Sequence, residues 1–497
     1  MSAHRSFTVA VLFGAVFSAS SALGQKVSID WHNVRLISKT TPTLQVVVNP
    51  PLRRGSAIHD RAFAELRKLG ADYVRYVPWL PYPKLGVAEL KPPANGNTSW
   101  NFSLIDPMTE DFMSATHGHS VILNFSTSPA WLWKTAKPVT YPKDPNQVDW
   151  HYTQGTELRD PSGKQLGDYY ARLVSWYVNG GFTDKYGKRH ESGHHYKIPY
   201  WEVLNEVDFE HNMTPEQYTA RYDAIVSAIK RVDSSMKFVA LALASPRNEP
   251  RMFEYFLNHK NHKPGTPINF ISYHFYASPT PDQSPDVQQY TFFDQAAGFL
   301  DTVRYIDRIR KRLSPHTRTD IDEIGSIAAN DNNPNETPDH LAKRLPDSYW
   351  SLSGALYAYI FGNLDELGID VAGESQLVGY PSQFPSVTMV NWKTGAPNAR
   401  FRVLQLIKDN FGPGDKIVKA SSGTPYVYVL AVINRRGEHK LLLVNKRNRD
   451  IRLTLPRRAK RIEFVDVTTK GAPPQTKRVQ DNTIALHGFE VAAVTLR

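Results

Sequence analysis

The feature that most constrains the fold is a regular alternation of short apolar segments with amphipathic segments between residues 41 and 412. Strands that alternate with helices indicate βαβ units and a parallel sheet. Eight such repeats over ~370 residues match a (β/α)8 TIM barrel with long loops, an α/β fold. The expected strands are 44–48, 73–77, 120–125, 198–204, 238–243, 269–274, 320–324 and 368–373. The expected helices are 58–69, 165–178, 215–232, 252–259, 293–313, 347–361 and 398–410.

The pattern changes after residue 412. Short β-rich runs at 426–433, 440–444, 451–455, 462–467 and 491–496 are separated by Gly, Pro and Asn clusters. This spacing predicts a small antiparallel β-sandwich over residues 413–497, with hairpin turns at 435–437 and 446–448. We expect residues 25–40 to add an N-terminal strand to this sandwich, and residues 41–412 to form the barrel.

The N-terminus has the pattern of a secretory signal peptide. Arg5 precedes an uncharged apolar run over 7–23, and the small residues Ala22 and Gly24 stand before Gln25. We expect residues 1–24 to be removed, which places the mature protein outside the cytoplasm, either secreted or periplasmic. The alternative is an uncleaved anchor helix, but the run is short for a span and no basic cluster follows it. We therefore expect no transmembrane span after signal removal.

The positive charge is confined to the C-terminal segment. Residues 416–497 contain 17 Lys or Arg and 6 Asp or Glu, whereas the other 415 residues carry 42 of each sign. The basic runs at 446–449 and 457–461 suit an anionic glycan or surface as partner. The alternative is a solvated basic face with no specific partner. Nucleic acid is not expected, because no nucleic-acid motif accompanies the charge.

Two carboxylates stand at expected strand ends. Glu206 follows the apolar run 198–204 and Asn205, and Glu323 lies 117 residues further on, within the strand 320–324. In a barrel, residues that follow the strands' carboxyl ends share one mouth, so strands four and seven can direct both side chains into one cleft. Two carboxylates across a cleft are what glycoside hydrolysis needs, one protonated and one ionised. The alternative is that both are ordinary loop acids.

These motifs resemble clan A glycoside hydrolases, and family 39 in particular, over nearly the whole mature chain. Residues 201–206, Trp-Glu-Val-Leu-Asn-Glu, are similar to the family's acid/base strand, and 322–325, Asp-Glu-Ile-Gly, to its nucleophile strand. The resemblance implies a retaining glycosidase with Glu206 as acid/base, Glu323 as nucleophile and Asn205 as partner of the sugar 2-hydroxyl. Val207 departs from the family, in which Pro is frequent at that position.

The resemblance extends to two further strands. Residues 73–76, Tyr-Val-Arg-Tyr, are similar to strand two, where Arg75 would support the nucleophile, and 272–276 are similar to strand six, where His274 and Tyr276 would line the site. An arginine beside a carboxylate lowers its pKa, and a neighbouring carboxylate raises the pKa of Glu206. The alternatives are a structural ion pair for Arg75 and an ordinary hydrogen-bonded histidine for His274. Because side chains alternate along a strand, we expect only one of Asp322 and Glu323 to face the cleft.

Aromatic side chains are expected to bind the sugar rings. Trp79, Trp131, Trp133 and Trp392 fall in or near expected loops at the barrel mouth. Sugars stack on aromatic faces. We expect two of the four to touch the ligand, and the first three are the better candidates because they follow strands two and three.

One motif suggests a different chemistry. Residues 190–194, His-Glu-Ser-Gly-His, match the zinc-peptidase pattern, which requires a helix to bring both histidines to one face. Gly187 and Gly193 indicate a loop instead, so we expect no metal, and the sequence indicates no cofactor. Without cysteine, the chain also has no thiolate ligand or nucleophile.

The sequence therefore predicts a secreted retaining glycosidase that acts on an oligosaccharide or polysaccharide, with β-xylosides as the first substrates to test. The alternative is a non-catalytic carbohydrate-binding or cell-surface protein built on a barrel, whose working surface is the basic sandwich.

Overall fold

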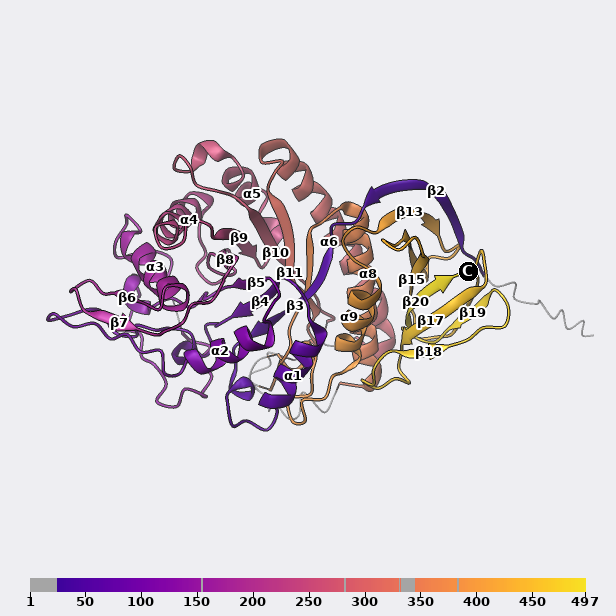
Figure 1. The fold of residues 1–497 in the computed structure, drawn as a ribbon, viewed down its shortest axis with the longest axis horizontal. Coiled ribbons are helices and arrows are strands. Elements are labelled where there is room, and N and C mark those ends of the chain that lie inside the picture. The colour runs from indigo at the N-terminus through magenta and orange to yellow at the C-terminus, as the bar shows by residue number, and fades with distance from the viewer. Residues whose placement is uncertain (1–24, 153–154, 281–282, 330, 332–344, 382–383) are drawn as a thin grey trace, which may run out of the picture.

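A computed structural model describes residues 25–152, 155–280, 283–329, 331, 345–381 and 384–497. Figure 1 shows a barrel with surrounding helices beside a β-rich module that ends at the C-terminus. The predicted signal peptide, residues 1–24, lies outside the described ranges. In those ranges, no helix is long and apolar enough to cross a membrane.

Eight parallel strands close into a barrel, which confirms the predicted fold class. They follow one another in chain order, and β12 pairs with β3 to complete the ring. The strands are β3 (Thr41–Val47), β4 (Val74–Val77), β5 (Val121–Leu123), β8 (Tyr200–Glu202), β9 (Lys237–Leu243), β10 (Phe270–Ala277), β11 (Arg318–Ser326) and β12 (Val371–Glu374). The loop that carries Glu206 therefore follows the fourth barrel strand, and Glu323 lies on the seventh.

Helices surround the barrel. Their bounds are α1 (His59–Leu69), α2 (Asp106–Ala115), α3 (Lys164–Val178), α4 (Pro215–Lys230), α5 (Pro250–Phe256), α6 (Pro285–Leu313), α8 (Asp347–Leu367) and α9 (Ala399–Asn410). Gly70 ends α1 in the left-handed region, at the residue where the sequence predicts its end. The helix α2 was not predicted, because acidic and hydroxyl residues interrupt the apolar spacing of its buried Met108 and Phe112.

The C-terminal module consists of two sheets. Seven strands form one sheet in the order β18-β17-β20-β15-β14-β13-β2, and three form the other in the order β1-β16-β19. The bounds are β1 (Gln25–Lys26), β2 (Ser28–Ile37), β13 (Lys416–Ser421), β14 (Val427–Ile433), β15 (His439–Asn445), β16 (Ile451–Thr454), β17 (Ala459–Val465), β18 (Gln475–Lys477), β19 (Thr483–Leu486) and β20 (Val491–Leu496). The N-terminal strand β2 thus reaches across to pair with β13.

The sequence predictions for this module were incomplete. The turn at 435–437 joins the antiparallel strands β14 and β15, as predicted. The turn at 446–448 forms no hairpin, because β15 pairs with β20 and the chain crosses to β16 in the other sheet. The strands β13, β18 and β19 were not predicted: β13 and β18 carry exposed polar residues, and β19 has only four residues.

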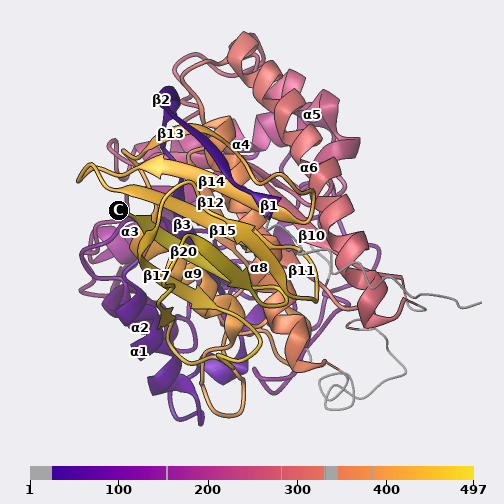
Figure 2. The same cartoon turned by 90° about the vertical axis from the view of Figure 1, so that its right-hand side faces the viewer.

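The seven-stranded sheet is buried on both faces. Along β14, Leu430 and Val432 belong to the large core shared with the barrel, whereas Val429 and Ala431 belong to the core of the sandwich. This follows from the two-residue period of a strand. Figure 2 shows the sheet lying over α8 and α9. The module is therefore packed directly on the barrel.

A short antiparallel pair, β6 (Gly181–Thr183) and β7 (Arg189–Glu191), lies between α3 and β8. It includes the start of the zinc-peptidase pattern, so the helix that this motif requires is not formed. His190 instead contacts Asp184, with 3.0 Å between Nε2 and Oδ2, and His194 lies 3.6 Å from Asp106. The two histidines therefore serve different loop contacts.

Candidate active site

The acid/base candidate sits in a strained turn directly after β8. The backbone φ angles are 64° at Leu204 and 41° at Glu206, a region that residues with a Cβ rarely adopt. The Glu206 amide donates to the Ala242 carbonyl, 2.8 Å away, which ties the turn to β9. Such conformations cost about 1–3 kcal/mol each and cluster at functional sites. The turn holds Asn205 and Glu206 in fixed directions at the barrel mouth.

Glu323 is presented by an irregularity in β11. Its neighbours on both sides shift register there: Ser272 pairs with Asp320 but His274 pairs with Glu323, so β11 has one extra residue. The same shift appears against β12. A bulge of this kind breaks the alternation of side chains. Strict alternation therefore fails here, since both acids contact Arg75, but Glu323 lies at the edge of the site and Asp322 is buried beneath it.

Arg75, on β4, joins the two predicted catalytic strands. Its Nη1 donates to Glu323 Oε1 at 2.5 Å and to Gln45 Oε1 at 2.7 Å. Its Nη2 donates to Asn205 Oδ1 at 2.6 Å, and its Nε to Glu202 Oε2 at 2.5 Å. The side chain is 1% exposed, so these contacts are made away from water. Arg75 thus orients both the nucleophile candidate and the asparagine beside the acid/base candidate.

His274 and Tyr276, on β10, complete the contacts. His274 Nδ1 lies 2.9 Å from Glu206 Oε1 and 3.6 Å from Glu323 Oε2. The Tyr276 hydroxyl donates to Glu323 Oε2 at 2.6 Å. The structure therefore brings together Arg75, Asn205, Glu206, His274, Tyr276 and Glu323, six of the residues that the sequence selected.

The two glutamates have opposite pKa shifts. Burial raises the pKa of Glu206, and the charge of Glu323 adds to this effect although His274 opposes it. Burial also acts against ionisation of Glu323, but His274, Arg75 and the Tyr276 hydroxyl hold the pKa of this carboxyl below its ordinary value. One glutamate is thereby set up to carry a proton and the other to be ionised.

The carboxyl groups are close together. Glu206, His274 and Glu323 each offer one ligand-type atom, and these atoms all lie within 4.8 Å of one another. In glycosidases, a carboxyl separation of about 5–5.5 Å accompanies retention and about 6.5–9.5 Å inversion. The approach of these single oxygen atoms is compatible with the closer, retaining arrangement.

More carboxyl groups lie beneath the site. Glu202 accepts a hydrogen bond from Ser272 Oγ at 2.6 Å, and Asp322 lies 3.0 Å from Arg75 Nε. Burial raises the pKa of Asp320 and Asp322 well above the ordinary range, and the nearby Glu202 adds to it. By contrast, the Arg75 charge and hydrogen bonds hold the pKa of Glu202 below its ordinary value despite burial. The shifts thus favour the neutral form of Asp320 and Asp322 and the ionised form of Glu202.

Glu210 is a functional candidate that the sequence analysis missed. It lies four residues after Glu206, and its backbone amide donates to the Glu206 carbonyl. Its Oε1 accepts from Trp79 Nε1 at 2.7 Å and from Asn205 Nδ2 at 2.8 Å. Burial, with the charge of Glu206, raises the pKa of Glu210 well above its ordinary value. The spacing to Glu206 was the only signal in the sequence, and it is too common to identify a site.

The tryptophans differ in position. Trp79 contacts Glu210 and lies in an aromatic group with Trp150 and Phe384, whose ring centroids are 5.5 and 6.1 Å from its own. Trp133 is fully buried and packs against the ring of His211, so its side chain is a core element rather than a sugar contact.

Trp131 and Trp392 are both half-buried against the large core. Trp131 donates from Nε1 to the Glu89 carbonyl, which fixes it to the loop after β4. The structure therefore brings only Trp79, of the four tryptophans, into contact with the site network among the described residues.

Two groups of side chains in the described ranges have the spacing of metal ligands. One is the group of candidate residues described above, Glu206, His274 and Glu323. Burial lowers the pKa of His274, but the two glutamates outweigh it and raise the pKa above the ordinary value, which favours an imidazolium that cannot ligate a metal. The other group is Asp466, His487 and Glu490 in the sandwich, where Lys477 already pairs with Glu490.

The comparisons with known proteins agree with this architecture. The sequence model described as the alpha-L-arabinofuranosidase 1 domain matches residues 148–298, which include Glu206. This match spans less than a third of the chain. No curated protein sequence matches this chain.

Solved structures match nearly the whole chain. A GH51 arabinofuranosidase from Xanthomonas axonopodis pv. citri has a TM-score of 0.63 at 13% identity, over 95% of this chain and 100% of that one. A GH30 endoxylanase from Clostridium papyrosolvens C71 has a TM-score of 0.57 at 13% identity, with the same coverage. A glucosidase from Croceicoccus marinus has a TM-score of 0.61 at 15% identity, over 96% and 99%.

The chain shares its fold with these GH51 and GH30 glycoside hydrolases. Identities this low establish the shared fold alone, and the predicted likeness to family 39 in particular is not shown by these matches. The barrel with its packed sandwich is therefore the common element.

Proposed function

We propose that this chain is a retaining glycoside hydrolase that acts outside the cytoplasm on oligosaccharides or polysaccharides. The observation that carries the proposal is the approach of Glu206 and Glu323 within 4.8 Å, with pKa shifts of opposite sign. Related folds in arabinofuranosidases and xylanases support it. The N-terminal pattern of residues 1–24 supports export.

The mechanism is a double displacement. The Glu323 carboxylate attacks the anomeric carbon while protonated Glu206 gives its proton to the leaving oxygen, forming a glycosyl–enzyme ester. The Glu206 carboxylate then takes a proton from water, and the resulting hydroxide displaces Glu323 and releases the sugar. Asn205, whose amide is oriented by Arg75 and Glu210, is placed to donate its remaining N–H to the sugar 2-hydroxyl.

The substrate class follows from two likenesses. The resemblance of the motifs at 201–206 and 322–325 to family 39, which rests on the sequence alone, makes β-xylosides the first substrates to test. The match of residues 148–298 to the alpha-L-arabinofuranosidase 1 domain makes α-L-arabinofuranosides the next.

The test is hydrolysis of a panel of aryl glycosides by the wild type and by Glu206→Ala and Glu323→Ala. We expect both variants to lose activity, by about 10²–10⁴-fold for the acid/base variant, and azide to restore part of the rate of Glu206→Ala. The control is Glu254→Ala, which removes an exposed glutamate of α5 that pairs with Arg312. Full activity in both site variants would refute the assignment. Carbohydrate binding without hydrolysis of any glycan in the panel would favour the non-catalytic alternative.

A further inference from the structure

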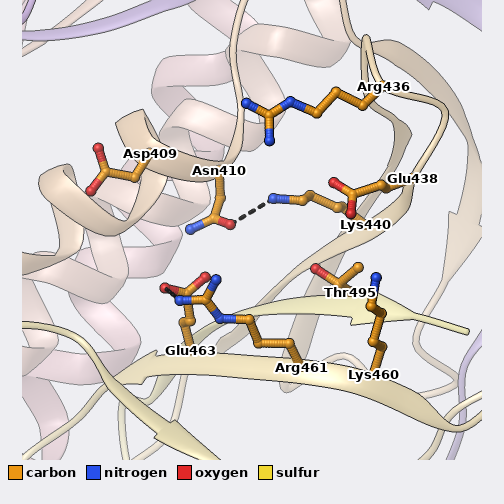
Figure 3. A pocket seen from close by; sticks show the side chains of 9 residues that line it. All are labelled: Asp409, Asn410, Arg436, Glu438, Lys440, Lys460, Arg461, Glu463 and Thr495. Atoms are coloured by element: carbon orange, nitrogen blue, oxygen red, sulfur yellow. Dashed lines mark hydrogen bonds and ion pairs between the residues drawn. The ribbon is translucent and has the colours of Figure 1, made fainter.

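A cavity of about 450 Å³ lies where the end of α9 meets the interior strands β15, β17 and β20 of the seven-stranded sheet. Asn410 contributes from α9, Arg436 from the β14–β15 turn, Lys440 from β15, and Lys460 and Arg461 from β17. Figure 3 shows these side chains entering the cavity from opposite sides. Helix and sheet share one hydrophobic core behind the cavity.

Two of the basic groups are already engaged. Lys440 Nζ donates to Asn410 Oδ1 at 2.7 Å, and Arg461 pairs with Glu463 at 2.8 Å. Arg436 and Lys460 are exposed, and neither has a carboxylate within ion-pairing distance in the described ranges. The cavity therefore offers two cations that make no direct ion pair in the described ranges, beside a lysine and an amide that bond to each other.

The acids that line the cavity are occupied by other partners. Glu438 accepts from Asn434 Nδ2 at 2.9 Å, and Asp409 lies 3.4 Å from Lys408. The Asn434 hydrogen bond lowers the pKa of Glu438, and the charges of Lys440, Lys460 and Arg436 lower it further. The lining therefore carries four basic and three acidic side chains, an excess of one positive charge.

The cavity continues toward the barrel. A second cavity of about 260 Å³ shares Asn410, Arg436 and Lys440 with it and extends to Thr41 and Asp72. These two residues lie at the amino ends of β3 and β4, whereas Glu206 and Glu323 lie toward the carboxyl ends of their strands. The groove is therefore at the opposite end of the barrel from the proposed catalytic mouth.

We propose that this groove binds an acidic saccharide, with Arg436 and Lys460 pairing with its carboxylate or sulfate group and Asn410 and Lys440 contacting its hydroxyls. The volume lies in the range of pockets that hold small ligands, and its polar lining suits a hydroxylated one. A flat anionic membrane could not reach Asn410, which is only 9% exposed. The larger cavity has no aromatic lining on which a nucleobase could stack.

The position of the groove allows it to bind a polymer without blocking the barrel mouth. A polymer that is held at the bottom of the barrel leaves the mouth open to a different segment or chain. The sandwich would then anchor the enzyme to acidic polysaccharide while the barrel hydrolyses its own substrate. This site is independent of the proposed glycosidase activity, because it shares no residue with the catalytic network.

The experiment measures binding of a galacturonic acid tetramer to the full chain by calorimetry, with a neutral galactose tetramer as the matched ligand. We expect the acidic tetramer alone to bind, and the double variant Arg436→Glu/Lys460→Glu to weaken it about tenfold or more, as lost charged hydrogen bonds predict. The control Arg457→Glu/Arg458→Glu makes the same change in net charge at exposed residues that do not line the cavity. It should weaken binding much less.

Three results would overturn the proposal: no binding of the acidic tetramer, equal binding of the neutral one, or equal losses in the two double variants. Competition by free sulfate or phosphate as effective as that of the tetramer would identify a simple anion site instead. Thermal melting checks that each variant is folded. Hydrolysis of a neutral aryl glycoside should be unchanged in both double variants, so that a failed binding site and a failed glycosidase assignment are distinguishable.

Discussion

At the scale of single residues, His274 links the groups that would do the chemistry. It lies between Glu206 and Glu323, and its Nε2 is 3.5 Å from Asp322. Its positive charge lowers the pKa of each glutamate. One side chain therefore influences both the group that must be protonated and the group that must be ionised.

Replacement of His274 by Gln should move both limbs of the pH profile of kcat/KM upward. Activity is lost at low pH when Glu323 takes up a proton and at high pH when Glu206 loses one. Loss of the imidazolium raises both pKa values, so both limbs shift to higher pH. Initial rates across about pH 4 to 9 measure this. Unmoved limbs, or a shift to lower pH, would contradict the assigned role.

Glu210 provides a second test at this scale. Its Oε1 accepts from both Trp79 and Asn205, and its raised pKa favours the neutral acid, which a glutamine amide can replace. We expect Glu210→Ala to lower kcat/KM about 10–100-fold, as loss of a supporting contact does at other sites, and Glu210→Gln to retain most activity. Equal losses in the two variants would indicate that the charge matters rather than the hydrogen bonds.

At the scale of elements, the bulge in β11 is decisive because it turns two adjacent acids inward. Asp322 is 2% exposed beneath the site, whereas the Glu323 side chain is 10% exposed at its edge. The raised pKa of Asp322 and the lowered pKa of Glu323 give the two acids different roles in a space shared with Arg75.

Amide substitutions separate these roles. Glu323→Gln should abolish turnover, because an amide cannot form the glycosyl ester. Asp322→Asn should reduce activity far less, since the amide resembles the neutral acid in size and polarity. Asp322→Leu should lower the free energy of unfolding by about 1–3 kcal/mol, because buried polar neighbours lose a partner. Steady-state rates and denaturant unfolding measure these outcomes. The reverse order of activity loss would make Asp322 the nucleophile.

The bulge also shows which features of the site the sequence patterns could not predict. Strand-end position and motif similarity were enough to select Glu206 and Glu323 together with Arg75, His274 and Tyr276. Strict alternation then excluded Asp322, because an inserted residue leaves no trace in the hydrophobic pattern. The position of Glu210 in the site and the burial of Trp133 depend on contacts between loops, and the local spacing of residues does not predict these contacts.

At the scale of the whole molecule, the sandwich and the barrel are joined by a close contact. Gly362 on α8 faces Tyr428 on β14, and a Cβ at this glycine would lie 2.7 Å from the tyrosine hydroxyl oxygen. Tyr428 also donates to Glu366 at 3.0 Å. The sequence predicted part of the strand pattern of the C-terminal segment. Its packing on α8 depends on contacts between residues far apart in the chain, which the pattern does not contain.

Gly362→Ala should therefore destabilise the fold by about 1–3 kcal/mol, as overpacking does in cores. The control is Gly298→Ala in α6, where the nearest atom to a new Cβ is Arg247 Nη1 at 3.8 Å. There, alanine should stabilise the helix by up to ~1 kcal/mol. Chemical denaturation of both variants gives the comparison. Equal free energies of unfolding in the two variants would contradict the close contact between α8 and the sheet at Gly362.

The most direct test of the central claim is NMR observation of the first sugar product released from a glycoside that the enzyme cleaves. Two carboxyl groups this close should give a product with the anomeric configuration of the substrate, before mutarotation mixes the anomers. A product of the opposite configuration would contradict the double displacement through Glu323.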